Sequence, residues 1–192
     1  MTDTAKPTIT LQQIRDAGPC ESGWRKLNKA LGNPDMARKI SIGDVVLSNG
    51  LDDALWCLRV LPPRERVTAV MPSVRRASAR TSDPRVDECI ADIDRWLAGD
   101  DSVDMQSAAA SAAKAAFLAR DTAARSAAQS AAGAAEAAAA GAAAGAAASA
   151  WASAWASASA SAAVAWTTER KQQRRDLLDM FPPLVLTEGK AK

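Results

Sequence analysis

The stretch Gly141-Ala-Ala-Ala-Gly145-Ala-Ala-Ala-Ser149-Ala-Trp151-Ala-Ser153-Ala-Trp155-Ala-Ser157 decides the fold predicted for this chain. It lies in a longer run, residues 107–166, that is built almost entirely of alanine, serine and glycine. Alanine has the highest intrinsic helix propensity, so we expect the run to be helical. Because an alanine side chain buries little area, the run cannot form an ordinary core, but it permits very close approach between helices. Such a surface favours packing or binding over catalysis.

The helical pattern continues from about residue 102 until Pro182-Pro183. A compact chain is expected to fold so long a segment back at least once. Each glycine in a helix interior costs about 1 kcal/mol relative to alanine, so we expect a bend between Gly133 and Gly145. Residues 102–181 are therefore predicted to be long alanine-rich helices in a hairpin or bundle, followed by a tail at 182–192. A single unbroken helix is the alternative.

Residues 1–101 read as a separate domain of short helices. Thr10 with Gln13, and Ser41 with Asp44, fit capping boxes, in which two residues three apart satisfy the first backbone groups of a helix. Further helix starts are expected at Ser22, at Asp52 or Asp53, and at Asp83-Pro84, and helix ends at Gly18-Pro19, Gly32, Asn49-Gly50 and Pro62-Pro63. Pro72 should kink or break the helix that contains it.

The apolar residues of this domain recur at helical spacing. Trp24, Leu27 and Leu31 share one face, and Trp24 and Trp56 are interpreted as core residues. No segment alternates apolar and polar residues as a half-buried strand would. The predicted fold class is therefore all-α, with a short-helix N-terminal domain packed with long alanine-rich helices.

The composition argues against an enzyme. The chain has no histidine, which removes the usual general base and the commonest metal ligand. Cys20, Cys57 and Cys89 fit neither zinc-binding spacing nor a disulfide framework, so we expect buried, reduced thiols in a cytoplasmic protein. The sequence contains no phosphate-binding loop and no nucleophile elbow. We expect no catalytic residues, no metal and no cofactor.

A membrane span is one alternative for the alanine-rich run. No charge lies between Glu136 and Glu169, and small residues recur every four positions, as in packed membrane helices. The run has almost no leucine, isoleucine, valine or phenylalanine, and many serines. Since alanine and serine gain little from lipid, we expect helix packing outside a membrane.

Two groups of residues are candidates for binding a partner protein. Trp151 and Trp155 lie four apart and so share a helix face, and tryptophans are typical interface anchors. The basic cluster on the last helix consists of Arg170, Lys171, Arg174 and Arg175. The alternatives are that the tryptophans pin the alanine-rich helix to the N-terminal domain, and that the cluster is a solvated helix end stabilised by the helix dipole.

A second basic segment is the candidate for binding nucleic acid. Its candidate residues are Arg64, Arg66, Arg75, Arg76 and Arg80. The segment that follows, residues 83–101, is rich in aspartate and glutamate. Pairing between the two segments would explain both without a ligand.

Two blocks of the N-terminal region, LQQIRDAGPCESGW at 11–24 and SNGLDDALWCLR at 48–59, resemble a group of phage and prophage proteins of unknown function. In that group an N-terminal domain precedes alanine-rich repeats, and the charged segment 166–178 is similar to the helix that closes them. Related alanine-repeat proteins are labelled immunity proteins. The small residues Gly141, Gly145, Ser149 and Ser153 depart from the polar or aromatic residues usual in the repeat. The resemblance implies no catalytic residues.

These observations predict a non-enzymatic, phage-encoded interaction protein in the host cytoplasm. Its expected task is to bind and sterically block a host protein, most concretely a defence protein of a CRISPR-Cas system. The alternatives are a nucleic-acid-binding accessory protein, an immunity protein that neutralises a toxin, and an ice-binding or surface-active helix suggested by the regular serines. A homo-oligomer formed through the Ala/Gly/Ser face fits all of them.

Overall fold

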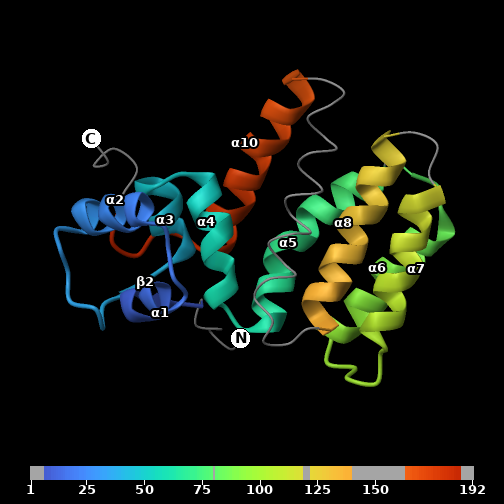
Figure 1. Cartoon of the computed structure of the whole chain (residues 1–192), viewed down its shortest axis with the longest axis horizontal. Helices are drawn as coiled ribbons and strands as arrows, with labels where there is room; N and C mark the ends of the chain where they lie inside the picture. The colour runs from blue at the N-terminus through green and yellow to red at the C-terminus, as the bar shows by residue number, and fades with distance from the viewer. Residues whose placement is uncertain (1–6, 80, 119–121, 140–162, 187–192) are drawn as a thin grey trace. The chain divides into compact units, whose positions relative to one another are not determined.

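A computed structural model describes residues 7–79, 81–118, 122–139 and 163–186 of the chain (Figure 1). The predicted all-α class is confirmed, because helices make up most of these residues. One small sheet was not predicted. Strands β1 (Ile9–Thr10) and β2 (Lys39–Ile40) pair antiparallel, with Ile9 opposite Ile40. Two-residue strands are too short to show the alternation from which a strand is recognised.

The described chain divides into two compact units. Unit 1 comprises residues 1–62 and 170–192, and unit 2 comprises residues 63–169. The boundary differs from the expected division at residue 102, because the helices of residues 63–97 pack with the alanine-rich helices. Unit 1 is therefore assembled from two segments of the chain, with unit 2 inserted between them.

Unit 1 contains four short helices and a 3₁₀ turn from its first segment. They are α1 (Leu11–Asp16), α2 (Glu21–Leu31), α3 (Ile42–Ser48), α4 (Leu51–Cys57) and η1 (Leu58–Val60). Its fully buried side chains include Leu11, Ile14, Ile40, Ile42 and Leu177. The last of these belongs to helix α10 (Ala163–Met180), within which the unit boundary falls.

The capping predictions hold at three helices. Capping boxes form at Thr10 with Gln13 and at Ser41 with Asp44, and Asp83 caps a helix whose first residue is Pro84. Two predicted starts are wrong. Helix α2 begins at Glu21 because the Cys20 side chain, rather than that of Ser22, accepts the N–H of Gly23. Helix α4 begins at Leu51 after Gly50, so the aspartates that follow are not its N-cap.

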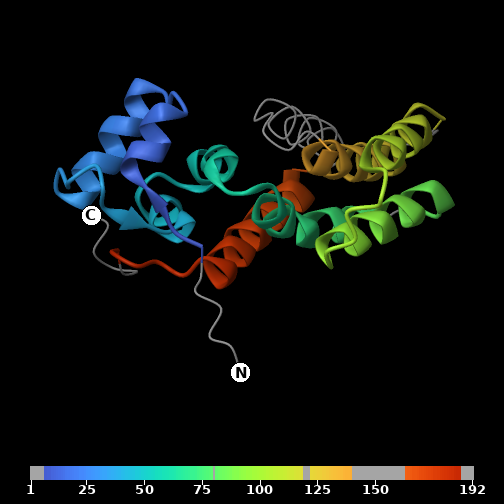
Figure 2. The same ribbon diagram turned by 90° about the horizontal axis from the view of Figure 1, so that it is seen from below.

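In the described part of unit 2, four helices pack side by side as a bundle (Figures 1 and 2). They are α5 (Pro63–Ser78), α6 (Pro84–Leu97), α7 (Met105–Leu118) and α8 (Thr122–Ala139). Pro72 lies within α5 without ending it, so the expected break is absent. Gly133 is buried inside α8, and the first reversal of the alanine-rich region comes earlier, between α7 and α8. The chain therefore stays helical from Gly133 to Ala139, and the rest of the interval predicted for the bend, residues 140–145, lies outside the described residues.

Alanine forms one wall of the core of unit 2. Ala112, Ala127, Ala131 and Ala135 are fully buried. Larger side chains from α5 and α6, among them Met71, Val74, Val86 and Ile93, supply the rest of the core. The thiol of Cys89 on α6 lies 3.6 Å from the carbonyl oxygen of Ala131, so a side chain of one helix reaches the backbone of its neighbour. This is the close approach that small side chains permit.

A C-terminal segment of unit 1, residues 181–186, crosses the first turn of α3. Gly43 makes room for it, because a Cβ atom there would overlap the carbonyl oxygen of Phe181 and lie 2.9 Å from the nitrogen of Pro183. The fully buried carboxylate of Asp44 accepts hydrogen bonds from the backbone N–H groups of Leu184, Val185 and Leu186, at 3.2, 2.9 and 2.8 Å. The same carboxylate accepts the N–H of Ser41 at 2.9 Å. One side chain thus caps a helix and holds the segment.

Within the described ranges, every helix is too short or too polar to cross a bilayer.

Candidate functional site

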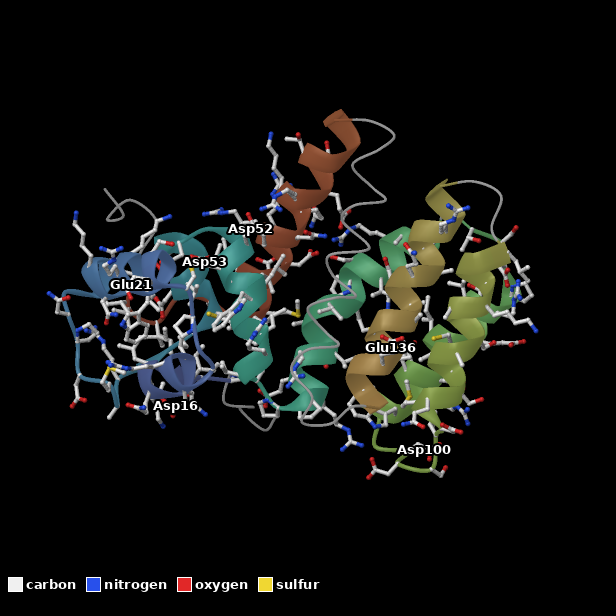
Figure 3. All side chains as sticks on the ribbon, viewed as in Figure 1. Asp16, Glu21, Asp52, Asp53, Asp100 and Glu136 are labelled. Carbon is white, nitrogen blue, oxygen red and sulfur yellow. The ribbon has the colours of Figure 1, made fainter. Side chains whose placement is uncertain are left out.

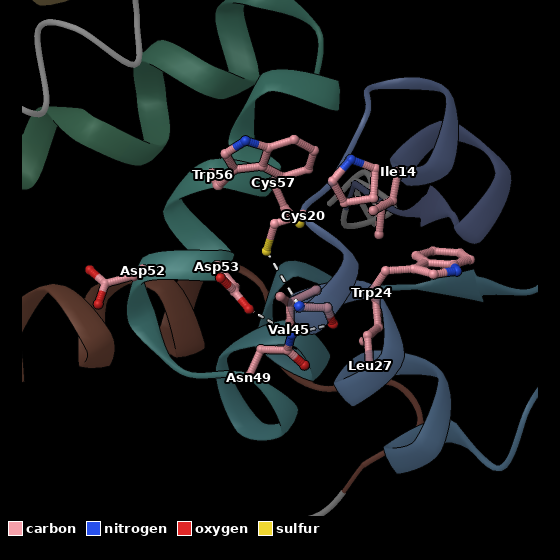
Figure 4. A pocket seen from close by; sticks show the side chains of 12 residues that line it. Ile14, Cys20, Trp24, Leu27, Val45, Asn49, Asp52, Asp53, Trp56 and Cys57 are labelled. Atoms are coloured by element: carbon pink, nitrogen blue, oxygen red, sulfur yellow. Dashed lines mark hydrogen bonds between the residues drawn. The ribbon is translucent and has the colours of Figure 1, made fainter.

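A pocket of about 190 Å³ opens in unit 1 between α1, α2, the end of α3 and α4 (Figure 4). We call it the tryptophan pocket, because the indoles of Trp24 and Trp56 form part of its wall. Its other lining residues are Ile14, Pro19, Cys20, Gly23, Leu27, Val45, Asn49, Asp52, Asp53 and Cys57. The wall is thus apolar and aromatic, with a few polar groups from three short helices.

Gly23 positions the acidic side of the tryptophan pocket. A Cβ atom at this residue would lie 2.9 Å from Oδ2 of Asp53 and 3.1 Å from Sγ of Cys20. The missing side chain therefore lets the Asp53 carboxylate of α4 approach the first turn of α2. A glycine inside a helix lowers the stability of that helix, and at Gly23 it makes room for the Asp53 carboxylate at the pocket wall.

Asn49 links helix α2 to helix α4 through its side-chain amide. Its Nδ2 donates to the carbonyl oxygen of Gly23 at 2.8 Å and to Oδ2 of Asp53 at 2.7 Å. The backbone carbonyl oxygen of Asn49 accepts a hydrogen bond from Nζ of Lys26 at 2.9 Å. Both bonds from Nδ2 go to acceptors, so the amide orientation is determined by its partners. The hydrogen-bonding capacity left on the amide is that of Oδ1, an acceptor.

The two tryptophans are only partly buried. Trp24 and Trp56 were expected in the core, and this is wrong for the part of each indole that lines the pocket. The guanidinium of Arg59 stacks on Trp56 at 4.2 Å from the ring centroid, and that of Arg15 lies 6.0 Å from Trp24. Neither arginine is among the lining residues, so the indoles are held from outside the pocket.

The tryptophan pocket holds two thiols with opposite properties. Cys57 is buried, and the burial raises its pKa to about 12. Cys20 is exposed, which corrects the expectation that all three cysteines are buried. Hydrogen bonds with the hydroxyl of Ser22 and the N–H of Gly23 lower the pKa of Cys20, and the nearby Asp53 carboxylate acts in the opposite direction. A lowered pKa and exposure are the two conditions for a reactive thiol.

Asp52 and Asp53 are neighbours on α4 and differ in their partners (Figure 3). Oδ1 of Asp52 pairs with Arg170 at 2.8 Å. Oδ2 of Asp53 accepts a hydrogen bond from Asn49 at 2.7 Å. Of the two pocket carboxylates, Asp53 is the one without an ion-pair partner among the residues that the structure describes.

The residues predicted to bind a partner protein are only partly described. Trp151 and Trp155 lie outside the described residues. Arg170 is partly buried and forms an ion pair with the exposed Asp52. Lys171 and Arg175 are exposed, and Arg174 is half-buried. Of the predicted residues, the structure describes only the basic cluster, which presents two exposed cations, Lys171 and Arg175.

The arginines predicted to bind nucleic acid belong to unit 2. Arg80 lies outside the described residues. Arg64 pairs with Asp101 at 2.6 Å, and Arg75 pairs with Asp94. These two ion pairs join the basic and acidic segments, as the alternative of mutual pairing expects for two of the arginines. Arg76 forms a bidentate ion pair with Glu169, with hydrogen bonds of 3.0 and 2.8 Å. Arg66 is buried. Nucleic-acid binding stays a prediction.

Comparison with family models, curated proteins and solved structures found no match for this chain. The resemblance to phage proteins therefore stays a prediction. Among the described residues, no cluster of three or more histidine, cysteine, aspartate or glutamate side chains could hold a metal ion.

The candidate site was missed at the sequence level because its residues looked structural. Trp24 and Trp56 fit apolar helix faces, and Asp53 fits the acidic first turn of a helix. The signal that could have revealed it is Gly23, a glycine inside a helix beside a tryptophan, which implies close approach of another group.

Proposed function

We propose that this chain is a non-enzymatic interaction protein that binds a partner protein through the tryptophan pocket. The observation that carries the proposal is the pocket's size together with its wall. Its volume of about 190 Å³ is below the range of about 300–1,000 Å³ typical of small-molecule and cofactor sites. A single side chain of another protein fits this space.

The wall has the chemistry of an interface anchor site. Tryptophan is enriched among the residues that dominate binding energy, and such residues line well-packed pockets. The indole of Trp56 is already held in place by the stacked Arg59. A partner therefore does not need to order this indole on binding, which lowers the entropic cost of association.

The partner we propose is a host protein that is blocked sterically, with a CRISPR-Cas defence protein as the concrete version. This narrower statement rests on the resemblance of residues 11–24 and 48–59 to phage proteins. A toxin neutralised by an immunity protein would be bound in the same way. A homo-oligomer through the alanine-rich face and a cytoplasmic location belong to the same proposal.

The test is capture of partners from a nuclease-treated bacterial lysate with the tagged full chain. We expect one stoichiometric protein that is retained by the wild type and lost with Trp56→Ala. The matched control is Trp96→Ala, because Trp96 is also a half-buried tryptophan beneath an arginine, Arg64, but lies in unit 2. Loss with both variants, or retention with both, would contradict binding through the pocket.

The remaining candidates, Trp151 and Trp155, can be tested in the same assay. If they anchor the partner, replacing both with alanine abolishes capture and leaves helicity unchanged. Recovery of nucleic acid alone, with affinity that falls steeply with salt, would instead favour the nucleic-acid alternative.

A further inference from the structure

We propose that the tryptophan pocket recognises a primary alkylammonium group, so that the side chain it takes from a partner is a lysine. The inference rests on the proposed function, whose site it deepens. It is carried by the polar atoms of the pocket, by its aromatic wall and by the Asp53 carboxylate, which makes no ion pair within the described part of the chain.

The polar groups that line the pocket are suited to a ligand that donates hydrogen bonds. Asp53 presents a carboxylate, and Asn49 has committed both protons of Nδ2 to Gly23 and Asp53. Sγ of Cys20 already acts as a hydrogen-bond acceptor, because it accepts the N–H of Gly23 at 3.3 Å. An anion would meet Asp52 and Asp53 in the same wall. The arrangement therefore selects a cation with N–H groups.

The aromatic and apolar parts of the wall fit the rest of a lysine side chain. The face of an indole attracts a cation, more strongly where water is excluded. Ile14, Leu27 and Val45 supply an apolar surface for the methylene groups that carry the ammonium. The indole of Trp56 already makes one cation–π contact, with Arg59 at 4.2 Å outside the pocket.

The carboxylate geometry favours an ammonium over a guanidinium. Oδ2 of Asp53 is engaged by Asn49 at 2.7 Å, which leaves Oδ1 as the oxygen for a ligand. Arginine binds carboxylates best through two parallel bonds to both oxygens. A lysine ammonium is a compact charge that can use one oxygen.

The test uses n-butylammonium chloride as the probe and the full chain, labelled with ¹⁵N. We expect saturable shifts of the Trp24 and Trp56 indole N–H signals at millimolar concentrations, with weaker response to n-butylguanidinium. Sodium butyrate and n-butanol at the same ionic strength should cause no saturable shift. Asp53→Asn should weaken butylammonium binding about fivefold, the size expected for loss of one partly exposed ion pair. Asp16→Asn is the matched control, because Asp16 is an exposed aspartate of unit 1 outside the pocket.

Equal responses to butylammonium, butyrate and butanol would overturn the inference, and so would unchanged affinity in Asp53→Asn. The proposed function fails in a different way. Capture of a partner that depends on Trp56 but is not reduced by excess butylammonium would overturn the lysine assignment alone. Saturable butylammonium binding without any captured partner would support the ammonium site and contradict the proposed function.

Discussion

The strongest test of the fold is the substitution Asp44→Asn. Oδ1 of Asp44 accepts the N–H groups of Val185 and Leu186, while Oδ2 accepts those of Leu184 and Ser41. Asparagine has the same shape but replaces one oxygen by an NH₂ donor. Whichever way the amide turns, at least two backbone donors lose their acceptor and face another donor.

The magnitude follows from these contacts. A hydrogen bond to a charged group contributes about 1.5–3 kcal/mol, so two lost bonds set an upper range of about 3–6 kcal/mol. Residues 184–186 are partly exposed, and water can therefore take up some of the released N–H groups. We expect Asp44→Asn to lower the free energy of unfolding of unit 1 by about 2–4 kcal/mol.

The assay combines urea unfolding, followed by circular dichroism, with hydrogen exchange. The two units can unfold separately, so exchange at the amides of Val185 and Leu186 supplies the local measurement. Both amides should lose their protection in Asp44→Asn. The control is Asp179→Asn, an exposed position on α10 where we expect a change below about 0.5 kcal/mol. If the two variants behave alike, the reasoning about this buried carboxylate is wrong.

Three further predictions address other contacts. Gly43→Ala should destabilise unit 1 by about 3 kcal/mol, the upper end of overpacking costs, because its Cβ would meet the backbone of Phe181 and Pro183. Combining it with Asp44→Asn should add little in urea unfolding, since both substitutions release the same segment. Ala131→Leu should lower the stability of unit 2 by about 1–3 kcal/mol through overpacking, whereas Ala110→Leu, at an exposed site on α7, should not, and equal melting temperatures would contradict the close packing. Iodoacetamide should modify Cys20 and spare Cys57 and Cys89, whose pKa values are about 12. The rate at Cys20 should rise with pH about a midpoint below that of an ordinary cysteine, because the pKa of Cys20 is lowered, and Ser22→Ala should move the midpoint upward, as read by mass spectrometry of timed samples.

Local signals in the sequence predicted the local structure well. Both capping boxes, the Asp83-Pro84 start and the left-handed Gly32 at the end of α2 follow from contacts within a few residues. Such contacts need no knowledge of the rest of the chain. The start of α2 was missed because a cysteine is an unusual cap, and the thiol of Cys20 accepts the N–H at 3.3 Å.

Long-range contacts could not be predicted in the same way. Asp44 fits a capping box on its own, and nothing near it in the sequence announces that it also binds residues 184–186. The tryptophan pocket has the same origin, because it forms where α2 and α4 meet across a gap of some 20 residues in the chain. In the alanine-rich region the sequence predicted close packing, but a repetitive composition does not determine which residues make the turn.

The contact between α3 and residues 181–186 has a consequence for folding during synthesis. Synthesis proceeds from the N-terminus, so the helices of residues 11–57 emerge long before their last partner. Until residues 184–186 have been translated, the carboxylate of Asp44 lacks three of its N–H donors, and the backbone at Gly43 is not yet covered by residues 181–183. Unit 2 is translated earlier, and its helices α5, α6, α7 and α8 contact one another within about 80 residues of chain. We therefore expect unit 2 to fold first on the ribosome. Unit 1, which begins the chain, should complete its fold last.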